Sequence, residues 1–293
     1  MTAALPLSLS TLPSWVPQHV ANAAGNALLA ELATWPKPGL VSHVDQGSHT
    51  DMDASTFEAS TAAIVPFFAL LTEAGANGAD MSALREVGVA AEQAMLLATG
   101  GINTHRGAIF GLGLLCAAAG ASWSSGRAGW RPVRLGNVVR QRWGGSILRG
   151  PIPLRSHGTD ALRRFGAGGA RAQAAAGFPH ALEVGLPALR HARLTRPDDL
   201  KAWRVQAFFA LLATMEDTNL LHRGGAEGLS FAQQAATEFL DKGGVAQDDW
   251  CRQAEDVHHA FVVRRLSPGG CADLLAISLF LDALETDAIE VCE

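Results

Sequence analysis

The chain has 293 residues, of which 48% are hydrophobic, and this length suits one large domain or two ordinary ones. Because a chain of this size and composition buries most of its apolar surface on folding, extensive disorder is excluded. The 23 Lys and Arg residues against 28 Asp and Glu residues give a formal net charge of -5, so no overall positive field attracts nucleic acid. Tyrosine is absent, which leaves acid and base roles to His, carboxylates, Ser, Thr, Cys or Lys.

Several common site types are also excluded. The four cysteines lie far apart with no Cys-x-x-Cys pair, which argues against a disulfide framework and a structural zinc site. The first basic residue is Lys37, so a signal peptide lacks its positive region, and no apolar run approaches the roughly 18 residues of a membrane span. The adjacent His258 and His259 fit a solvated helix face better than a ligand pair. We expect a reduced, soluble, cytoplasmic protein with neither nucleic acid nor a membrane as its partner.

Hydrophobic periodicity predicts the fold class. Apolar residues recur every three or four positions along Ala-rich segments, whereas alternation with period two is nearly missing. The pattern predicts an all-α fold, a single multi-helix bundle over residues 1–293. Pro66 should kink or split the second helix. The expected helices are 18–34, 54–74, 81–98, 105–120, 157–166, 171–177, 181–192, 199–216, 229–241, 248–264 and 269–285.

Residues 122–158 differ from the rest of the chain. They contain three Trp residues and many Gly residues, and no acidic residue occurs between Glu92 and Asp160. Eight arginines lie between positions 106 and 155. We interpret 122–158 as a long loop or a short-helix insertion with mostly solvated arginines. A lid over a phosphorylated substrate is the alternative.

The loop Pro36–Asp53 is the first of five polar or glycine-rich segments at predicted helix ends. It holds Lys37, His49, Asp51 and a third acidic residue besides Asp53. Neighbouring carboxylates repel one another unless a cation compensates, and Mg²⁺ prefers oxygen ligands, so the loop is a candidate metal site. Helix capping by Asp53 is the alternative, and it explains one carboxylate.

The segment Gly100–Phe110 has the outline of an anion site. Two glycines end one predicted helix, and Asn103 or Thr104 caps the next. The first turn of that helix presents His105, Arg106 and free backbone amides, an arrangement that favours an anion. An ordinary helix-loop-helix corner with an exposed arginine is the alternative.

Three further segments have the same character. In 156–179, two glycines precede Arg171 at the start of a short helix. In 215–225, an apolar helix ends in polar residues that suit either a functional site or a C-cap. In 266–276, a Ser-Pro-Gly-Gly sequence starts a helix. Each Gly in a helix interior costs about 1 kcal/mol relative to Ala, so the pair favours close approach of a phosphate to the backbone.

Together these segments resemble one known family, the triphosphoribosyl-dephospho-CoA synthases that serve citrate lyase and malonate decarboxylase. The length and the intervening sequence are more similar to the malonate decarboxylase branch. The resemblance spans residues 31–281 and runs in order through PKPGLV, HTDMD, AEQAML, GGINTHRGAIFGLGLL, GARAQAAAGFP, EDTN with RGG, and SPGGCADLLA.

Two positions and one segment depart from the family pattern. Arg106 stands where the family usually has Lys, which keeps the charge but changes its geometry. Gln173 stands where the family usually has Glu, and an amide cannot serve as a base. The segment 122–158 has no clear counterpart.

The resemblance implies transfer of the triphosphoribosyl group of ATP to the ribose 2′-hydroxyl of 3′-dephospho-CoA, with adenine as the leaving group. Displacement at an anomeric carbon develops oxocarbenium character, so the site needs anionic groups and a base near the ribose. The retained triphosphate needs Mg²⁺, arginines and open helix N-termini. The product is a prosthetic-group precursor, which implies a downstream prosthetic-group transferase and an acyl carrier protein as partners. A homodimer is a further candidate assembly.

The resemblance also implies roles for individual residues, which we expect to converge on one central pocket built from the glycine-rich helix-end loops. Catalytic work falls to Glu92, Asp273 and His49, and Mg²⁺ binding to Asp51, Asp53 and Asp217. Substrate and phosphate binding falls to Lys37, Asn103, His105, Arg106, Arg171, Asn219, Arg223, Ser267, Gly269 and Gly270.

Two other functions stay open at this point. A Mg²⁺-dependent N-ribosyl glycohydrolase of the ADP-ribosyl type would use the same carboxylates but give the ribosyl group to water. A non-catalytic helical adaptor would need a broad apolar surface, and it would not need so many glycine-rich helix starts.

Overall fold

The structure is a computed structural model that describes residues 12–124, 130–151 and 164–290, with side chains for all of these except 287–290. Across these ranges the chain is helical and forms no β-strand, which confirms the predicted all-α class. The expected helix at 157–166 falls mostly on 152–163, outside the described residues. The elements are α1 (Trp15–Leu32), α2 (Ala54–Ala76), α3 (Met81–Ala98), α4 (Arg106–Ser124), α5 (Pro132–Arg142), α6 (Gly144–Arg149), α8 (Gly169–Ala176), the π-helical turn η1 (Ala181–Gly185), α9 (Leu186–Thr195), α10 (Leu200–Thr214), α11 (Thr218–Asp241), the 3-10 turn η2 (Gly244–Ala246), α12 (Trp250–Val263) and α13 (Gly269–Glu290).

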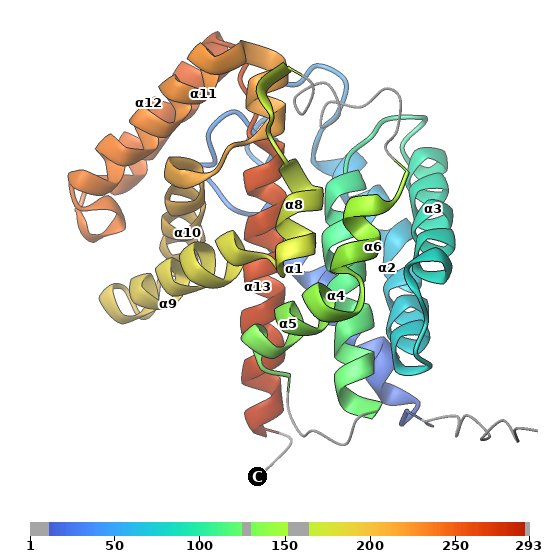
Figure 1. Ribbon diagram of the computed structural model, residues 1–293. Coiled ribbons are helices and arrows are strands. Elements are labelled where there is room, and N and C mark those ends of the chain that lie inside the picture. The colour runs from blue at the N-terminus through green and yellow to red at the C-terminus, as the bar shows by residue number, and fades with distance from the viewer. Residues whose placement is uncertain (1–11, 125–129, 152–163, 291–293) are drawn as a thin grey trace, which may run out of the picture.

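Helices α4 and α13 run through the middle of the bundle, with α1 and α2 behind them (Figure 1). Helix α3 covers α2 on one side, and α9 to α12 lie on the opposite side of the molecule. Most residues of α4 are buried because its sequence is mainly Ala, Gly, Leu and other apolar residues, so no face of it needs solvent. A helix that is apolar all round belongs in a core.

Glycines let α2 and α4 approach until their backbones touch. A Cβ atom on Gly75 of α2 would lie 1.9 Å from the Ala117 carbonyl oxygen of α4. Reciprocally, a Cβ atom on Gly120 of α4 would lie 1.9 Å from the Thr72 carbonyl oxygen of α2. This contact fixes the register of α4 against α2, and with it the position of the first turn of α4.

Two larger differences from the predicted helices concern α2 and α11. Helix α2 is continuous through Pro66, so the expected split is absent. Helix α11 begins at Thr218, eleven residues before the start expected at 229, and it is interrupted only at Gly225, where φ is 62° and ψ is -160°. Only glycine adopts that backbone conformation without strain, which explains why the Arg-Gly-Gly sequence bends a helix there.

The Trp- and Arg-rich segment is packed against the bundle where the structure describes it. It forms α5 and α6, as the short-helix interpretation expects. Trp130 and Trp143 are almost fully buried, and their indole nitrogens donate to the carbonyls of Ala119 (3.3 Å) and Ala79 (3.0 Å). Buried aromatic side chains with satisfied N–H groups anchor this segment to α4 and to the α2–α3 turn.

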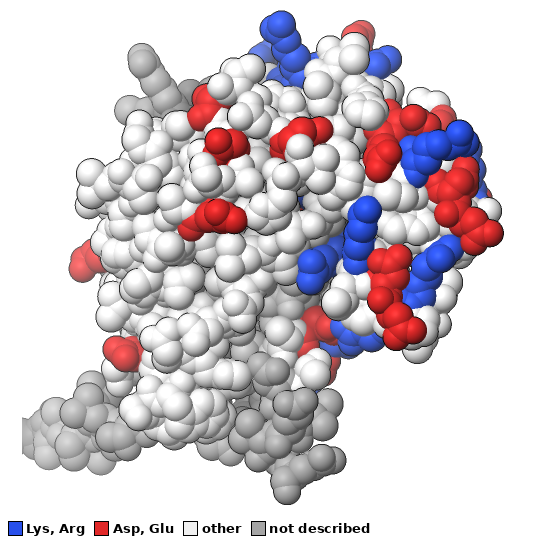
Figure 2. Space-filling model, turned by 180° about the vertical axis from the view of Figure 1, so that it is seen from behind, with Lys and Arg blue, Asp and Glu red and all other residues white. Residues whose placement is uncertain are grey.

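The surface behind the bundle is unevenly charged. Seen from behind, Lys and Arg gather on the side of α9 to α12, and a wide part of the remaining face shows only scattered acidic groups (Figure 2). Helices α2 and α4 are long and apolar enough to cross a membrane by length and composition alone. In α4 the apolar window is 78% buried inside the bundle, whereas in α2 it is only 28% buried. Helix α2 therefore presents an apolar surface outward.

Candidate active site

Four of the polar segments meet at one end of the bundle, the upper end in Figure 1. There the loop 33–53 lies beside the first turns of α4, α11 and α13. The carboxylate of Asp273 in α13 lies against Gly107 in α4, where a Cβ atom would be 2.0 Å from Oδ2. The Cys271 amide of α13 donates to Asp217, the residue ahead of α11 (2.8 Å). The structure thus gathers helix starts that are far apart in the sequence.

Asp217 is fully buried and uses both of its carboxylate oxygens. Oδ1 accepts from the amides of Asn219 (2.8 Å) and Leu220 (3.2 Å) and caps α11. Oδ2 accepts from the Cys271 amide and caps α13. Burial raises the pKa of the Asp217 carboxyl, and the three amides oppose that rise. One buried carboxyl therefore holds two helix starts together.

The glycine pair that opens α13 has a packing reason. A Cβ atom on Gly269 would lie 2.7 Å from the side-chain nitrogen of Asn219, and one on Gly270 would lie 3.0 Å from Oδ2 of Asp217. Larger residues would push these side chains away from the helix start. Close packing therefore explains Gly269 and Gly270 as well as the close approach of a phosphate to the backbone does.

Lys37 and Glu31 form a buried ion pair between the loop and the end of α1. Lys37 is 1% exposed, and its Nζ contacts the Glu31 carboxylate and donates to the Glu31 carbonyl (2.8 Å). Burial lowers the pKa of Lys37 and raises that of Glu31, while their attraction opposes both shifts. Glu31 was not among the predicted site residues, although a Glu in an Ala- and Leu-rich helix six residues before a Lys is a readable sign of such a pair.

Asp273, whose side chain is partly exposed, lies beside the buried Glu31 and Asp217, and we call these three residues the buried acidic cluster. Burial raises the pKa of Asp273 well above its usual value, and the negative charges of Glu31 and Asp217 raise it further. Asp273 thus interacts with both other carboxyls of the cluster, and Glu31 also pairs with the ammonium of Lys37. Such a cluster binds a proton or stabilises positive charge that develops beside it.

His105 lies at the start of α4, with each ring nitrogen in a different situation. Nδ1 is 2.6 Å from the Ser60 hydroxyl of α2, and the Thr104 hydroxyl donates to the same Ser60 oxygen (2.7 Å). Nε2 is buried and has no hydrogen-bond partner among the described residues. Burial, and then the charge of Lys37, lowers the pKa of His105 to about 3. The imidazole is therefore uncharged at neutral pH.

His49 joins the loop to the turn before α13. Its Nε2 is 2.8 Å from the Ser267 hydroxyl, and Nδ1 is 3.3 Å from the Arg223 guanidinium. Arg223 also donates to the carbonyls of Ser48 (3.2 Å) and Arg265 (3.1 Å). Burial and the charge of Arg223 lower the pKa of His49 to about 4. Oδ1 of Asp51 is 3.8 Å from Nδ1 of His49, too far for a hydrogen bond, and the Asp51 side chain is 61% exposed.

His258 is buried, although the sequence pattern predicts that it lies on a solvated helix face. It is fully buried, its Nδ1 accepts from the Gly39 amide (3.3 Å), and its Nε2 is 3.1 Å from the Asp45 carboxylate. Gly39 has a φ of 69° and lies so close to α13 that a Cβ atom would be 2.1 Å from the Leu266 carbonyl oxygen. The loop that carries Lys37 is thus fixed on α12 by a buried histidine that helical periodicity could not distinguish from a surface one.

Several predicted site residues lie at the edge of this region or make local contacts. Arg106 pairs with Glu92 on the surface (2.9 Å), and Asn103 caps α4 by accepting from the Arg106 amide (3.2 Å). Arg171 donates to four backbone carbonyls of residues 147–151 and so closes the end of α6. Gln173, at the position where a Glu was expected, bonds His180 through both its amide atoms.

The three carboxylates predicted to bind Mg²⁺ are not grouped in the structure. Asp217 is saturated by backbone amides, and Asp53 caps α2 by accepting from the amide and hydroxyl of Thr56 (both 2.9 Å). Asp51 points its exposed carboxylate toward His49. Within the described ranges no three His, Cys, Asp or Glu side chains are placed to hold a metal ion. Helix capping occupies both oxygens of Asp217 and one oxygen of Asp53, whereas Asp51 caps no helix.

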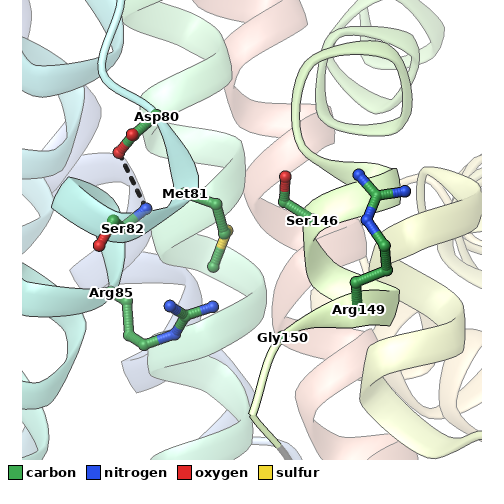
Figure 3. Close-up of a pocket in the computed structure, with 7 residues that line it drawn as sticks. All are labelled: Asp80, Met81, Ser82, Arg85, Ser146, Arg149 and Gly150. Atoms are coloured by element: carbon green, nitrogen blue, oxygen red, sulfur yellow. Dashed lines mark hydrogen bonds between the residues drawn. The ribbon is translucent and has the colours of Figure 1, made fainter.

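The expected central pocket is not among the two cavities that the structure shows most clearly. One, of about 310 Å³, lies between α3 and α6, where Arg85 and Arg149 extend from opposite walls and Asp80 accepts from Ser82 (Figure 3). The other, of about 580 Å³, is an apolar hollow at the end of α3, next to Gly100 and Gly101. Neither is lined by the buried acidic cluster, because the Lys37–Glu31 pair and the Asp217 caps close the side chains there onto one another.

Comparison with known proteins places the chain in a family. Residues 17–290 match the family described as ATP:dephospho-CoA triphosphoribosyl transferase. A Klebsiella pneumoniae protein named 2-(5''-triphosphoribosyl)-3'-dephosphocoenzyme-A synthase is 38% identical over 288 residues, which cover 93% of each chain. Relatives named for the same synthase occur in Pseudomonas fluorescens (strain Pf0-1), 38% identical over 93% of each chain, and in Acinetobacter calcoaceticus, 36% identical over 89% of each. No solved structure matches the chain. The protein therefore belongs to the ATP:dephospho-CoA triphosphoribosyl transferase family.

Proposed function

We propose that this chain transfers the triphosphoribosyl group of ATP to the ribose 2′-hydroxyl of 3′-dephospho-CoA and releases adenine. The observation that carries the proposal is the match to the transferase family over residues 17–290. The relatives named above cover 89–93% of this chain, so the likeness is not confined to one motif. The buried acidic cluster beside the starts of α4 and α13 supports the same reaction class.

The cluster suits the charge that the reaction develops. As the bond between the ribose C1′ and adenine N9 breaks, positive charge grows on the ribose ring, and nearby carboxyl groups stabilise it. The 2′-hydroxyl oxygen of dephospho-CoA then bonds to C1′. Its proton passes to a base, and adenine leaves with one proton in place of the broken bond, so the step balances without an oxidant or reductant.

Among the predicted bases, Asp273 fits this proposal best. It sits against the first turn of α4 within the buried acidic cluster, whereas Glu92 is held on the surface by Arg106. His49 binds Ser267 and Arg223 at the other side of the loop, so we place it with the groups that receive the triphosphate. In this proposal Lys37 supplies the positive charge that pairs with Glu31 of the buried acidic cluster.

The wider setting is also part of the proposal. Magnesium enters with ATP as its counter-ion, and no residue of the chain is assigned to it. We place the reaction in the cytoplasm and in the malonate decarboxylase branch, where a prosthetic-group transferase and an acyl carrier protein would use the product. The support for this branch is the similarity of length and intervening sequence noted above.

The test is to incubate the purified protein with ATP and Mg²⁺, with and without 3′-dephospho-CoA, and to follow free adenine and the mass of the CoA product. The proposal expects adenine release only with dephospho-CoA, in a one-to-one ratio with a CoA product enlarged by the triphosphoribosyl group. Release of adenine without dephospho-CoA would instead establish the glycohydrolase. If the protein turns over no ATP under any condition, the result favours the non-catalytic helical adaptor.

A further inference from the structure

A chain of two hydroxyls fixes the tautomer of His105. Thr104 donates to the Ser60 oxygen, so the single Ser60 proton is directed to Nδ1 of His105, 2.6 Å away. With Nδ1 accepting that proton, the neutral imidazole must carry its own hydrogen on Nε2. We call Thr104, Ser60 and His105 the hydroxyl relay. Ser60 is fully buried and His105 is 4% exposed, so water does not compete for these bonds.

The relay leaves a buried donor with nothing to bind inside the described protein. Nε2 of His105 has no acceptor there, although almost all buried N–H groups in native proteins have one. The two nitrogens lie on different sides of the imidazole ring, so Nε2 does not face Ser60. An unsatisfied buried donor costs about 1–3 kcal/mol, which favours an acceptor that arrives with a ligand.

The surroundings of His105 select the kind of acceptor. Burial and Lys37 keep the ring uncharged, so it offers a hydrogen bond without attracting an anion. Asp273 contacts Gly107, two residues along the chain from His105, and belongs to the buried acidic cluster, which repels phosphate oxygens. The Phe57 ring packs nearly perpendicular to the imidazole, with ring centroids 4.9 Å apart. A neutral, planar heterocycle with a ring-nitrogen acceptor fits this environment better than a phosphate does.

We propose that the hydroxyl relay holds His105 as a neutral Nε2–H donor whose acceptor is a ring nitrogen of the adenine in bound ATP. This inference rests on the proposed function, because that reaction makes adenine the leaving group. Electron density moves onto the purine ring as the C1′–N9 bond breaks. A hydrogen bond to another ring nitrogen therefore strengthens toward the transition state and aids departure.

In this proposal His105 contacts the substrate, and Ser60 and Thr104 are positioning residues. His105 keeps its proton throughout, since it donates a hydrogen bond and does not transfer charge. The adenine proton comes from the 2′-hydroxyl through the carboxyl cluster, and the relay needs no further reactant. If Ser60 is lost, Nδ1 and Nε2 compete for the same hydrogen and the donor is no longer fixed.

The first measurement is the tautomer itself, by ¹⁵N chemical shifts of labelled histidine in the intact protein. The His105 signal is assigned by its loss in a His105→Gln variant. The wild-type protein should show Nε2–H alone, whereas Ser60→Ala should show a mixture or the Nδ1–H form. A wild-type His105 with its proton on Nδ1, or a Ser60→Ala spectrum identical to the wild type, overturns the relay.

The second measurement links the donor to adenine. Release of the base is followed with ATP and with its 1-deaza, 3-deaza and 7-deaza analogues, each of which lacks one ring nitrogen. For one analogue, the loss of kcat relative to ATP should be about tenfold larger in the wild type than in the His105→Gln variant, because one neutral hydrogen bond has this order of effect. Equal losses in both proteins with all three analogues would mean that His105 does not donate to a ring nitrogen of adenine.

A matched control separates this role from general packing. Ser278→Ala removes a second fully buried helix serine, whose hydroxyl bonds only backbone carbonyls of its surroundings. Ser60→Ala should lower kcat by about tenfold with little change in KM for dephospho-CoA, whereas Ser278→Ala should leave kcat unchanged. Equal kcat values for the two variants would contradict the proposal. A wild-type protein that releases no adenine would overturn the proposed function and this inference together, whereas turnover without these differences would overturn the inference alone.

Discussion

Gly107 and Asp273 touch across the starts of α4 and α13, so closely that a Cβ atom on residue 107 would stand 2.0 Å from Oδ2 of the Asp273 carboxylate. Neither helix start could take this position if residue 107 carried a side chain. The contact brings the Asp273 carboxyl under the amides of the first turn of α4, which is where it meets the charges of Glu31 and Asp217. The two motifs are 166 positions apart in the sequence and form one site only because both helices begin at the same end of the bundle.

We predict that Gly107→Ala displaces the Asp273 carboxyl and lowers adenine release by at least about tenfold, with a loss of about 1–3 kcal/mol in the free energy of unfolding from overpacking. The matched control is Gly88→Ala in α3, where a Cβ atom meets nothing within 4 Å. That substitution should stabilise the protein slightly, since Ala is the better helix former. Similar unfolding curves for the two variants would contradict the close contact.

Asp273→Asn should separate stability from activity. Asp273 has a higher pKa in the folded protein than its usual value, so its contribution to stability is fully present below about pH 4 and is lost as the pH rises through the raised value. Asn resembles the protonated acid and stays uncharged. The variant should therefore gain melting temperature relative to the wild type at pH 8 and show little difference at pH 4. Both melting temperatures are measured by thermal unfolding. If the variant differs from the wild type by the same amount at pH 4 and pH 8, the pKa of Asp273 is not raised in the folded protein.

The buried pair of Lys37 and Glu31 should show strong coupling. Replacing only one partner leaves an uncompensated buried charge, so Lys37→Met and Glu31→Gln should each cost about 3–5 kcal/mol in the free energy of unfolding. The double variant should recover much of that loss. Urea denaturation of all four proteins gives the coupling energy. Additive losses would mean that the two side chains do not interact in solution.

The outward face of α2 predicts self-association. Ala62, Pro66 and Leu70 lie four residues apart along α2 and are all exposed, and Leu70 is 48% exposed. Helix α2 has 23 residues, so it is about 35 Å long and, with its side chains, about 10–12 Å wide. Each partner contributes roughly 800 Å² to a stable interface, so the interface would extend from α2 onto the neighbouring helices. We infer that a second copy of the chain covers this face.

Light scattering after size exclusion should then give twice the monomer mass of 30.7 kDa, and Leu70→Glu should return the monomer. Glu73, one turn along the same helix, shows that a carboxylate is tolerated there in a folded chain. Vesicle binding by a wild-type monomer would point to a lipid surface instead and would overturn the dimer.

The fold was predictable where small and apolar residues dominate. The helix expected at 105–120 corresponds to α4, because a long sequence of mainly small and apolar residues has few alternatives to a core helix. In contrast, α5 and α6 were not resolved from the sequence, since their Gly, Pro and Arg residues mask the period. Their place in the bundle depends on Trp143 and Ala79, which are 64 positions apart.

The site was predictable as a set of helix ends but not as a set of contacts. Lys37, His105, Asp217 and Asp273 stand where polar residues interrupt the helices, and the structure brings these interruptions to one end of the bundle. A carboxylate oxygen either caps a helix or stays free to bind a ligand. Which of the two it does depends on residues from other helices, and the local sequence does not show them. Asp217 therefore could not be distinguished from a metal ligand by its sequence context, nor Ser60 from an ordinary core serine.

The most direct test of the buried acidic cluster as the place of transfer is the rate of adenine release by Asp273→Asn in the presence of ATP, Mg²⁺ and 3′-dephospho-CoA. We predict a fall of at least about 100-fold, the usual range for loss of a general acid or base, in a protein that melts no lower than the wild type at pH 8. A folded variant with a rate within twofold of the wild type would contradict the assignment and move the chemistry to another part of the chain.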